Sequence, residues 1–471
     1  NTTGANNVAL GIRTLDVNTT GGSNTALGAD ALGSATTANN NTGIGQSALL
    51  ACTTGTPNTA VGANALDALT TGGNNNALGQ SALTTLTTGS YNNAFGTHAL
   101  EAATTQAASN AFGHRALDVA TDGQHNNAFG AEALGALTTG SYNVAVGGDA
   151  LGACTTGSGN TAVGDDALKA LTTASNNTAM GDYAADAVTT ANAIVAVGNG
   201  ALGACTTGSD NVALGVGAGS AITTQAYNTF LGHQSGRLCT DGQNVSIGAY
   251  SFYDATTAAN NVCVGGWAGQ DITIGDSNVC VGKSSGSLIT EGDGNVCVGL
   301  NAGDVITTGT NNIMIGLSSD PSAATTDNEL VVGTNSAVGK GDTTGFIAPS
   351  NGGVYQGNNS ANWSTTSDQR IKKNIVDNDV GLEAINQVRV RNFEYRTPDE
   401  IDELPKESAI DKEGLQLGVI AQEIKEILPD VVKQESTGCY SVNPDNMTWY
   451  LVNAVKELSA KVEELEKKLN G

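Results

Sequence analysis

Residues 143–147 read Asn-Val-Ala-Val-Gly, and residues 160–164 read Asn-Thr-Ala-Val-Gly. Phrases of this type recur along the chain, and successive copies lie 17 residues apart except for one step of 16. Asn lies four residues before the glycine in 17 of the twenty copies, with Ser109, Ile194 and Glu329 as the exceptions. The residue before the glycine is large and apolar in every copy. The twenty glycines are Gly11, Gly28, Gly45, Gly62, Gly79, Gly96, Gly113, Gly130, Gly147, Gly164, Gly181, Gly198, Gly215, Gly232, Gly248, Gly265, Gly282, Gly299, Gly316 and Gly333.

The length of the repeat decides the fold class. Seventeen residues are too few for a helix-turn-helix repeat, which needs about 34, and the apolar residues alternate instead of following a helical period. An Ala-Leu pair and then a Thr pair follow the glycine, as at Ala65-Leu66 and Thr70-Thr71. The repeat therefore predicts a mainly β protein in which residues 1–333 form a β-solenoid stalk. Each coil is expected to run strand, Gly turn, strand, Thr-rich turn, and twenty coils stacked about 4.8 Å apart give a rod roughly 90 Å long.

The pattern also predicts a role for each position of the coil. Neighbouring residues of a strand face opposite ways, so we expect the large residue before the glycine to fill the solenoid and the small residue before that to face outward. The glycine should accept a positive φ. The Asn should bond within its own turn or stack into a ladder with the Asn of the next coil.

Charge and cysteine usage exclude several function classes. The chain carries 20 Lys and Arg against 45 Asp and Glu, a net charge of −25, which argues against nucleic acid and anionic membranes as partners. No apolar run is long enough for membrane insertion. Cys263, Cys280 and Cys297 share one position in three consecutive coils, where we expect them to replace Ala as small buried residues. The histidines show no repeated ligand spacing, so neither a metal nor a cofactor is predicted.

The repeat ends near residue 333, and the composition then changes twice. Residues 334–366 are rich in Gly, Ser, Asn and Thr and are expected to form a connector. Residues 1–366 hold 6 basic and 24 acidic residues, whereas the much shorter stretch 367–471 holds 14 and 21. A second domain is therefore expected to begin near Ser367.

Three features follow one another in residues 367–471. The first is Ser-Asp-Gln-Arg-Ile-Lys-Lys-Asn-Ile at 367–375, and the second is Leu-Gly-Val-Ile-Ala-Gln-Glu at 417–423. The third is a predicted C-terminal helix, a coiled coil over about 447–470. Its apolar seam has steps of 4, 3, 4, 3 and 4 residues and consists of Leu451, Val455, Leu458, Val462, Leu465 and Leu469. Val alternating with Leu leans toward two strands, so the seam alone does not establish a trimer.

The repeat of residues 1–333 resembles the parallel β-roll of trimeric autotransporter adhesin heads, which carry a similar Asn-x-x-Ala-Ile-Gly phrase. The resemblance implies stacked coils and assembly around a threefold axis. The coils of those heads are usually shorter, so the additional residues here are expected to enlarge the Thr-rich turn.

Residues 367–471 resemble the C-terminal intramolecular chaperone of endosialidases and phage tail fibres, on the strength of the three features together. The resemblance implies a small α+β domain that makes the chain a homotrimer and then cuts itself off. By this likeness Ser367 is the nucleophile of a serine endopeptidase, Lys372 is its base, and cleavage falls between Thr366 and Ser367. The activity is expected on the chain itself and on no external substrate.

The spacing of this predicted Ser-Lys dyad imposes a condition. Residues five apart share neither a helix face nor a strand face, so the backbone must bend between Ser367 and Lys372. Arg370 is expected either to pair with Asp368 and fix that bend or to polarise the scissile carbonyl. The alternative is a helix cap at Ser367 and Asp368 followed by a solvated basic face. Gln422 and Glu423 are expected to be structural.

These observations favour the structural and receptor-binding fibre of a virion, similar to a phage tail fibre and assembled in the host cytoplasm. Its receptor would be a host-surface glycan or protein. One alternative is a cell-surface trimeric adhesin, which is disfavoured by the lack of a C-terminal membrane anchor in the sequence. Another is an ice-binding solenoid, but its Thr pairs are interrupted, for example at Asp122, Ile274 and Glu291. A polysaccharide-cutting fibre would need a carboxylate cluster, and none stands out from the repeat. Asp165, Asp166, Asp182 and Asp186 lie in neighbouring coils and could form such a site across three chains, but they are more simply explained as a solvated acidic rim.

Overall fold

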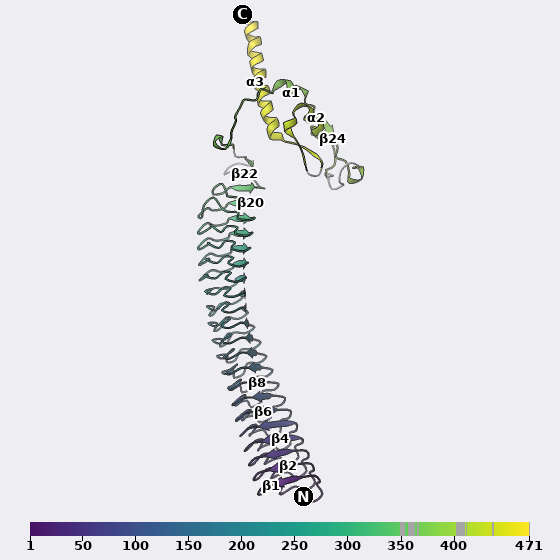
Figure 1. Ribbon diagram of the computed structural model, residues 1–471, viewed down its shortest axis with the longest axis vertical. Helices are drawn as coiled ribbons and strands as arrows, with labels where there is room; N and C mark the ends of the chain where they lie inside the picture. The colour runs from purple at the N-terminus through teal and green to yellow at the C-terminus, as the bar shows by residue number, and fades with distance from the viewer. Residues whose placement is uncertain are drawn as a thin grey trace. The chain divides into compact units, whose positions relative to one another are not determined.

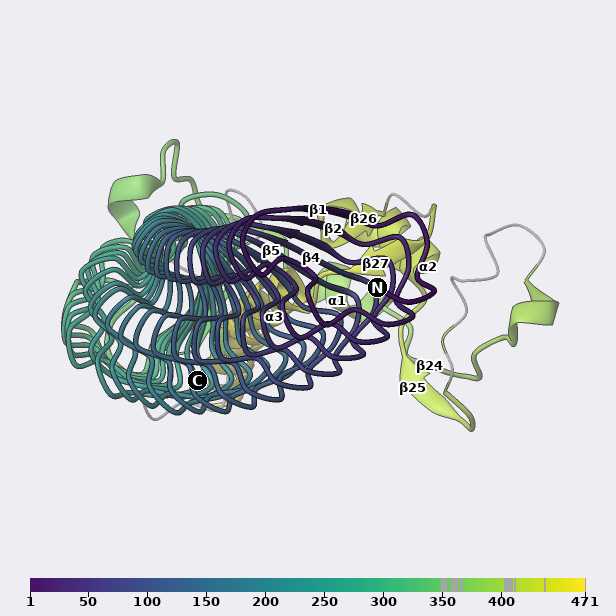
Figure 2. The same cartoon turned by 90° about the horizontal axis from the view of Figure 1, so that it is seen from below.

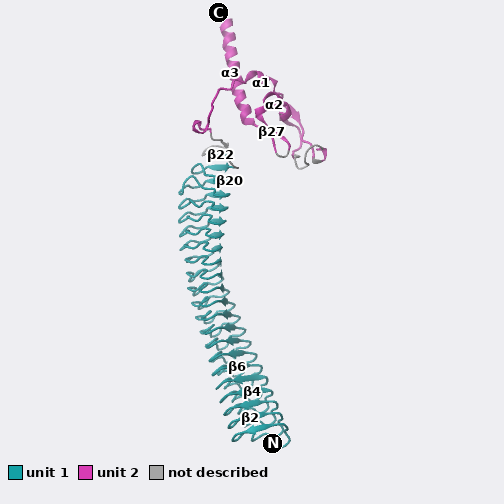
Figure 3. Cartoon of the chain, in the orientation of Figure 1, with its two compact units in different colours: residues 1–366 teal, residues 367–471 magenta. Residues whose placement is uncertain are grey.

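The computed structural model describes residues 1–348, 354–356, 363–364, 367–401, 410, 412–435 and 438–470. The chain divides into two compact units, Asn1–Thr366 and Ser367–Gly471 (Figure 3). Within the described residues, no helix is both long enough and apolar enough to span a bilayer.

The first unit is a parallel β-solenoid with one short strand in each coil. Each strand pairs in register with the strand 16 or 17 residues later, for example Ala145 with Ala162, and the strands stack along one side of the coils (Figure 1). Seen from its N-terminal end, the stack rotates gradually from coil to coil (Figure 2). The strands are β1 (Val8–Leu10), β2 (Thr25–Leu27), β3 (Thr42–Ile44), β4 (Asn58–Val61), β5 (Asn75–Leu78), β6 (Asn93–Phe95), β7 (Asn110–Phe112), β8 (Asn127–Phe129), β9 (Val144–Val146), β10 (Thr161–Val163), β11 (Thr178–Met180), β12 (Val195–Val197), β13 (Val212–Leu214), β14 (Thr229–Leu231), β15 (Val245–Ile247), β16 (Val262–Val264), β17 (Val279–Val281), β18 (Val296–Val298), β19 (Ile313–Ile315) and β20 (Leu330–Gly333).

The expected second strand of each coil is absent from the described solenoid, and that expectation was wrong. The residues after the glycine form successive tight turns, because alternate residues such as Asp30 and Leu32 have φ of 61° and 51°. The Gly33 amide bonds the Asp30 carbonyl at 3.1 Å, while the Leu32 amide bonds Ala48 of the next coil at 3.0 Å. The turn segment is therefore hydrogen-bonded to the neighbouring coil through its backbone, as the strand is.

The expected orientation of the strand side chains was also wrong. Ala26 is fully buried, whereas the larger Leu27 beside it is 42% exposed. The reason is the volume inside the coil, which the Leu of the turn segment already fills: a Cβ placed on Gly43 of β3 would lie 3.4 Å from Leu32 Cγ. Only a small residue fits at the inward position of the strand, so the large residue before the glycine faces outward.

Larger inward residues such as Phe230 and Cys263 are accommodated by glycines in the same coil or in the preceding coil. Phe230 is fully buried, and the Leu positions around it are Gly219 and Gly236, where an added Cβ would lie well inside contact distance of the Phe ring. The same exchange accompanies Cys263, whose Sγ would lie 2.5 Å from a Cβ on Gly269. Cys263, Cys280 and Cys297 are buried, free and in register, which confirms that they replace Ala in the core.

The Asn of the repeat forms a buried ladder, one of the two arrangements expected for it. The backbone amide of Asn41 donates to Asn24 Oδ1 at 3.0 Å, and Asn24 Nδ2 donates to the Ala38 carbonyl at 2.8 Å. Glu329 stands at the end of the ladder, where its buried carboxylate accepts the amide of Gly341 at 2.8 Å. The positive φ of the repeat glycine is confirmed as well. Gly28 has φ +131°, and a Cβ there would lie 2.5 Å from the Gly45 carbonyl oxygen.

Three further strands extend the sheet beyond the last repeat. β21 (Gly345–Ala348) pairs parallel to β20, and β22 (Val354–Gln356) pairs antiparallel to β21. β23 (Trp363–Ser364) pairs antiparallel to β22. The change from parallel to antiparallel pairing ends the solenoid geometry.

The second unit is a small α+β fold. In chain order it contains η1 (Gln369–Ile371), α1 (Leu382–Gln387), β24 (Arg391–Phe393), η2 (Pro398–Glu400), β25 (Gln416–Gly418), α2 (Ala421–Ile427), η4 (Pro429–Val431), β26 (Val432–Gln434), β27 (Tyr440–Val442) and the long helix α3 (Pro444–Leu469). Strands β24 and β25 form one antiparallel pair, and β26 and β27 form another. Its core consists of Ile424, Leu428, Val431 and Tyr450, with α1, α2 and α3 packed around them.

Candidate active site

Ser367 and Lys372 lie next to each other at the start of the second unit. The amine nitrogen of Lys372 is 2.5 Å from the hydroxyl oxygen of Ser367. The chain bends between them because η1 occupies residues 369–371, and the amide of Lys372 donates to the Gln369 carbonyl at 3.1 Å. The structure thus supplies the bend that the five-residue spacing requires. Thr366, the other residue of the predicted cleavage site, lies outside the described residues.

Asp368 and Arg370 hold this bend. The Asp368 side chain caps η1 by accepting the backbone amide of Arg370 at 2.8 Å. The Arg370 guanidinium returns to the same carboxylate, with Nη2 at 2.6 Å and Nε at 3.0 Å. This pairing holds the pKa of Asp368 below its usual range. Of the two roles expected for Arg370, the structure shows the pairing with Asp368.

The surroundings of the dyad are open in the single chain. Ser367 and Lys372 are both exposed. Three apolar side chains close to them in sequence are also exposed, with Ile371 at 69%, Ile375 at 63% and Val376 at 84%. The dyad thus lies in a segment whose apolar side chains are open to solvent in the single chain.

The segment that follows the dyad is attached to α3. Asn453 Nδ2 donates to the carbonyl of Asn378 at 2.7 Å and to that of Val380 at 3.2 Å. One turn earlier in the helix, the Tyr450 hydroxyl donates to Asp430 at 2.6 Å. Helix α3 therefore positions the chain between η1 and α1.

Residues 367–433 match the family model described as the chaperone of endosialidase. The second unit holds an endosialidase chaperone domain. Domains of this family act in the assembly of trimers and cleave themselves from the chains that they assemble. The match begins at Ser367, the residue that lies beside Lys372. No solved structure matches this chain.

The second sequence feature of the chaperone domain is structural, as expected for Glu423. Glu423 forms a two-point ion pair with Arg391 of β24, with Nη2 at 2.7 Å and Nε at 3.2 Å from its carboxylate oxygens. The Arg391 guanidinium lowers the pKa of Glu423. The ion pair joins α2 to the antiparallel strand pair β24–β25, while Gln422 stays exposed.

Helix α3 carries its apolar seam without a partner in the single chain. Leu451 is 46% exposed, Val455 is 65% exposed and Leu469 is 88% exposed. An amphipathic helix that leaves this face open is typical of a helix that associates with copies of itself.

Sequence reasoning missed the contacts that support the dyad segment. Asn453 lies 75 residues from Asn378, and neither Asn453 nor the Tyr450–Asp430 pair belongs to a recognisable motif.

Of the four carboxylates named as a candidate cluster in the stalk, Asp166 is paired with a lysine. Lys169 Nζ lies 2.9 Å from Asp166 and 3.2 Å from Asp149, so it bridges two coils. These contacts raise the pKa of Lys169. Asp182 Oδ1 accepts the backbone amide of Asp165 at 3.4 Å, and burial raises the pKa of Asp186.

Proposed function

We propose that residues 367–471 bring three copies of the chain together and then separate from them by cutting the bond between Thr366 and Ser367. The observation that carries this proposal is the 2.5 Å approach of Lys372 Nζ to Ser367 Oγ at the first residue of the family match. Ser367 is the nucleophile, Lys372 is its base, and Asp368 and Arg370 position them.

Ser367 supplies both the attacking oxygen and the leaving nitrogen of this reaction. Its Oγ attacks the carbonyl carbon of Thr366 while the hydroxyl proton passes to Lys372 Nζ. The amide nitrogen of Ser367 takes up that proton and leaves as an amine, so the two residues become joined by an ester. Water then hydrolyses the ester, which leaves a carboxylate at Thr366 and a free Ser367.

Assembly is the step that makes this reaction possible. A lysine serves as a base when burial lowers its pKa, and Lys372 is exposed in the single chain. Covering Ile371, Ile375 and Val376 with other copies would remove water from the dyad. Cleavage would then follow assembly and release only correctly formed trimers.

For the solenoid we propose the structural and receptor-binding part of a virion fibre, similar to a phage tail fibre and assembled in the host cytoplasm. The chaperone domain at its C-terminal side supports this role. A host glycan or protein receptor would bind the turn segments or one end of the rod, because loops on a rigid scaffold are free to vary. Labelled stalk released by self-cleavage should bind host cells, and the released chaperone domain should not.

The experiment that tests cleavage is mass spectrometry of the full chain after expression. The wild type should yield a stalk that ends at Thr366 and a fragment that begins at Ser367. Ser367→Ala and Lys372→Ala should stay full length and still form trimers, because each removes a reacting group and leaves the core intact. Lys373→Ala, which changes the neighbouring exposed lysine, is the matched control and should cleave like the wild type.

Two outcomes would contradict the proposed mechanism. One is an intact wild-type trimer after prolonged incubation, and the other is cleavage of the Ser367→Ala chain at the same bond. Hydroxylamine gives a further check, because it should convert the ester into a hydroxamate at Thr366. Deleting residues 367–471 from the gene should give misassembled stalk.

A further inference from the structure

The outward residue before each repeat glycine forms a continuous apolar row along the solenoid. All twenty members of this row are exposed or half-buried, among them Leu78 at 47%, Met180 at 45% and Leu231 at 40%. They stack directly above one another, because the strands pair in register from β1 to β20. We call these twenty residues the apolar row.

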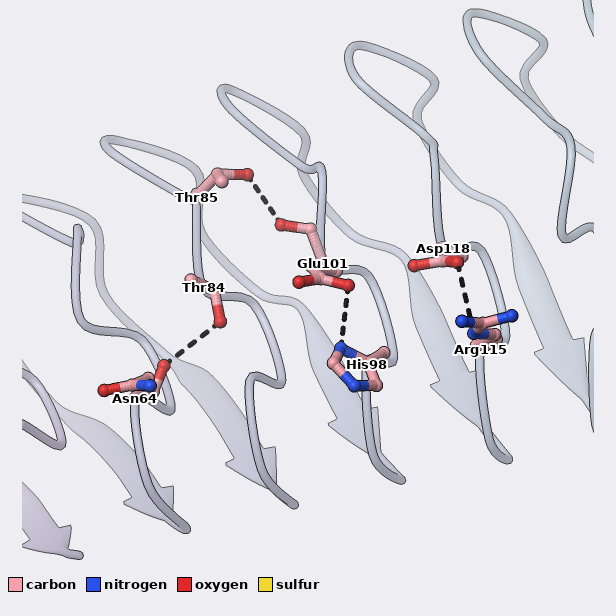
Figure 4. A network of polar contacts seen from close by, with 7 residues as sticks. All are labelled: Asn64, Thr84, Thr85, His98, Glu101, Arg115 and Asp118. Carbon is pink, nitrogen blue, oxygen red and sulfur yellow. Dashed lines mark hydrogen bonds and ion pairs between the residues drawn. The ribbon is translucent and has the colours of Figure 1, made fainter. Parts of the chain in front are cut away.

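The strand face that carries the apolar row holds no charged side chain. The other outward position of each strand lies two residues earlier and is Thr, Val, Asn, Ile or Leu in all twenty coils. Charged residues begin after the repeat glycine, on the turn segments, and the nearest to the row are Asp165, Asp182 and Lys283. Figure 4 shows two polar contacts of the turn segments in neighbouring coils, His98 with Glu101 at 2.8 Å and Arg115 with Asp118 at 3.8 Å. Chains this acidic repel one another least across their uncharged strand face.

The spacing of the side chains in the apolar row indicates which partner covers the row. A partner must present apolar side chains about every 4.8 Å along the whole rod, and a parallel copy of this chain does so. The area of the row is comparable to that of a stable interface. With exposed fractions such as 42% for Leu27 and 38% for Val146, twenty side chains offer on the order of 1,000 Å² of apolar surface per chain, against ~800 Å² per partner in a stable interface of two proteins. In a trimer each chain shares this area between two neighbours, and the outward Thr, Val and Asn side chains of the same strands add to it.

One block of the row differs from the rest. Phe95, Phe112 and Phe129 stack with ring centroids 4.6 Å and 4.9 Å apart. Beside them runs a half-buried ladder in which Asn93 Nδ2 donates to Asn110 Oδ1 and Asn110 Nδ2 donates to Asn127 Oδ1, both at 2.7 Å. Each inner amide keeps a second donor and a second acceptor site for a neighbouring chain.

This block can fix how far one chain is shifted against the next. Elsewhere the row repeats Leu, Val, Ile or Met, so a shift by one coil would change few contacts. At the block, a shift by one coil would place Asn127 of one chain opposite Val144 of the next chain. It would also place one Phe opposite a smaller side chain. Polar side chains within apolar interfaces set register in the same way in coiled coils.

We propose that three parallel copies of this chain pack their apolar rows against one another along the solenoid, with the Phe and Asn block setting the register. The number of copies rests on the proposed function of the chaperone domain. The contact surface does not, because it follows from the exposure, charge and period of the solenoid itself.

The first test is the molar mass of the released stalk, measured by light scattering. A variant with Leu78→Asp, Met180→Asp and Leu231→Asp should give monomers while keeping its β-type circular dichroism. The matched control places Asp at Val119, Leu288 and Val305, which are 41%, 49% and 40% exposed on the turn segments, and should remain a trimer. Equal masses for the two variants would overturn the inference.

A second test uses folded protein and does not depend on the Asp variants. Val163→Cys chains, oxidised after assembly, should form disulfide-linked dimers, and Val119→Cys chains should not. When Val163→Cys chains are coexpressed with Met180→Cys chains, only like residues should be linked. A block variant should permit a shift by one coil and therefore produce disulfides between Val163→Cys and Met180→Cys chains. This block variant combines Phe95→Val, Phe112→Val, Phe129→Val, Asn93→Thr and Asn110→Thr. Failure of Val163→Cys to link would overturn the packing, and unmixed links in the block variant would overturn the register role.

The proposed cleavage is measured separately from the packing of the solenoids. Cleavage between Thr366 and Ser367 is measured by mass in the same samples. Unaltered cleavage with a monomeric wild-type stalk would refute the packing and leave the proposed function standing. Chains that stay uncleaved and are nevertheless linked through Val163→Cys and not through Val119→Cys would refute the proposed cleavage and leave the packing standing.

Discussion

Ala145 and Val146 are adjacent in β9, yet Ala145 is fully buried and Val146 is 38% exposed. The smaller of the two residues forms the core, and the larger one faces away from it. The two positions therefore have different roles, and the same substitution should affect them differently.

Ala145→Asp should unfold the coils around it, because an unpaired carboxylate inside the core costs several kcal/mol. Val146→Asp should leave these coils folded. Hydrogen exchange of the backbone amides in residues 128–180 would show the difference, with loss of protection in Ala145→Asp alone. Equal loss of protection in both variants would refute the orientation of the strand.

Arg370→Ala should slow self-cleavage, because Asp368 would lose the guanidinium that holds it over η1. Arg370→Lys should restore part of the rate, since a lysine keeps the charge but only one of the contacts. The rate is measured as the appearance of the fragment that begins at Ser367. If Arg370→Ala instead shifted the pH profile of the cleavage rate and left the maximal rate unchanged, Arg370 would act on the protonation of Lys372 and not on the bend.

Asp320 should make the last coils less stable as the pH rises. Burial, together with the nearby Asp304, raises the pKa of Asp320 from 3.8 to about 6. The folded state therefore holds this proton more tightly than the unfolded state, so stability falls between about pH 4 and pH 6. Hydrogen exchange over residues 300–340 should show this fall in the wild type and a smaller one in Asp320→Asn. Asp210→Asn, which changes an exposed carboxyl, should behave like the wild type.

The cysteines of the stalk should resist alkylation in the folded chain. Burial raises the pKa of Cys52 to about 11, and the same applies to Cys154, Cys205 and Cys239. Because the thiolate is the reactive form, iodoacetamide at pH 8 should leave all seven stalk thiols unmodified until guanidinium unfolds the chain. Modification of Cys280 in the folded chain would show that the core opens.

The sequence was sufficient to locate the coils and their first strands, but it wrongly predicted a second strand in each coil and the direction of the strand side chains. The period placed each strand, and the glycine and Asn positions behave as their chemistry predicts. The orientation depends on Leu32 and its equivalents, which adopt positive φ and turn into the core. Leucine rarely takes that conformation, so the amount of space left opposite the strand is not visible in the pattern.

In the candidate site, too, some features could be predicted from the sequence and others could not. Ser367 and Lys372 were found from a motif, and the local Asp368 cap explains how they meet. The residues that hold the domain together around them, such as Arg391 with Glu423, are brought together by tertiary packing over 32 positions. No local property of the sequence predicts such a pairing.

The buried Asn ladder gives the solenoid a direction and a unit of growth. Each finished coil presents an Oδ1 acceptor to the amide of the coil that follows it, as Asn24 does for Asn41. Nascent chain leaving the ribosome can therefore add to an edge that is already formed. Loss or duplication of one whole repeat with Ala at its inward strand position would change the length of the rod by about 4.8 Å and keep the same type of contact between the coils that become neighbours. Recombination between such repeats could thus alter the length of the solenoid without any need to evolve a new fold.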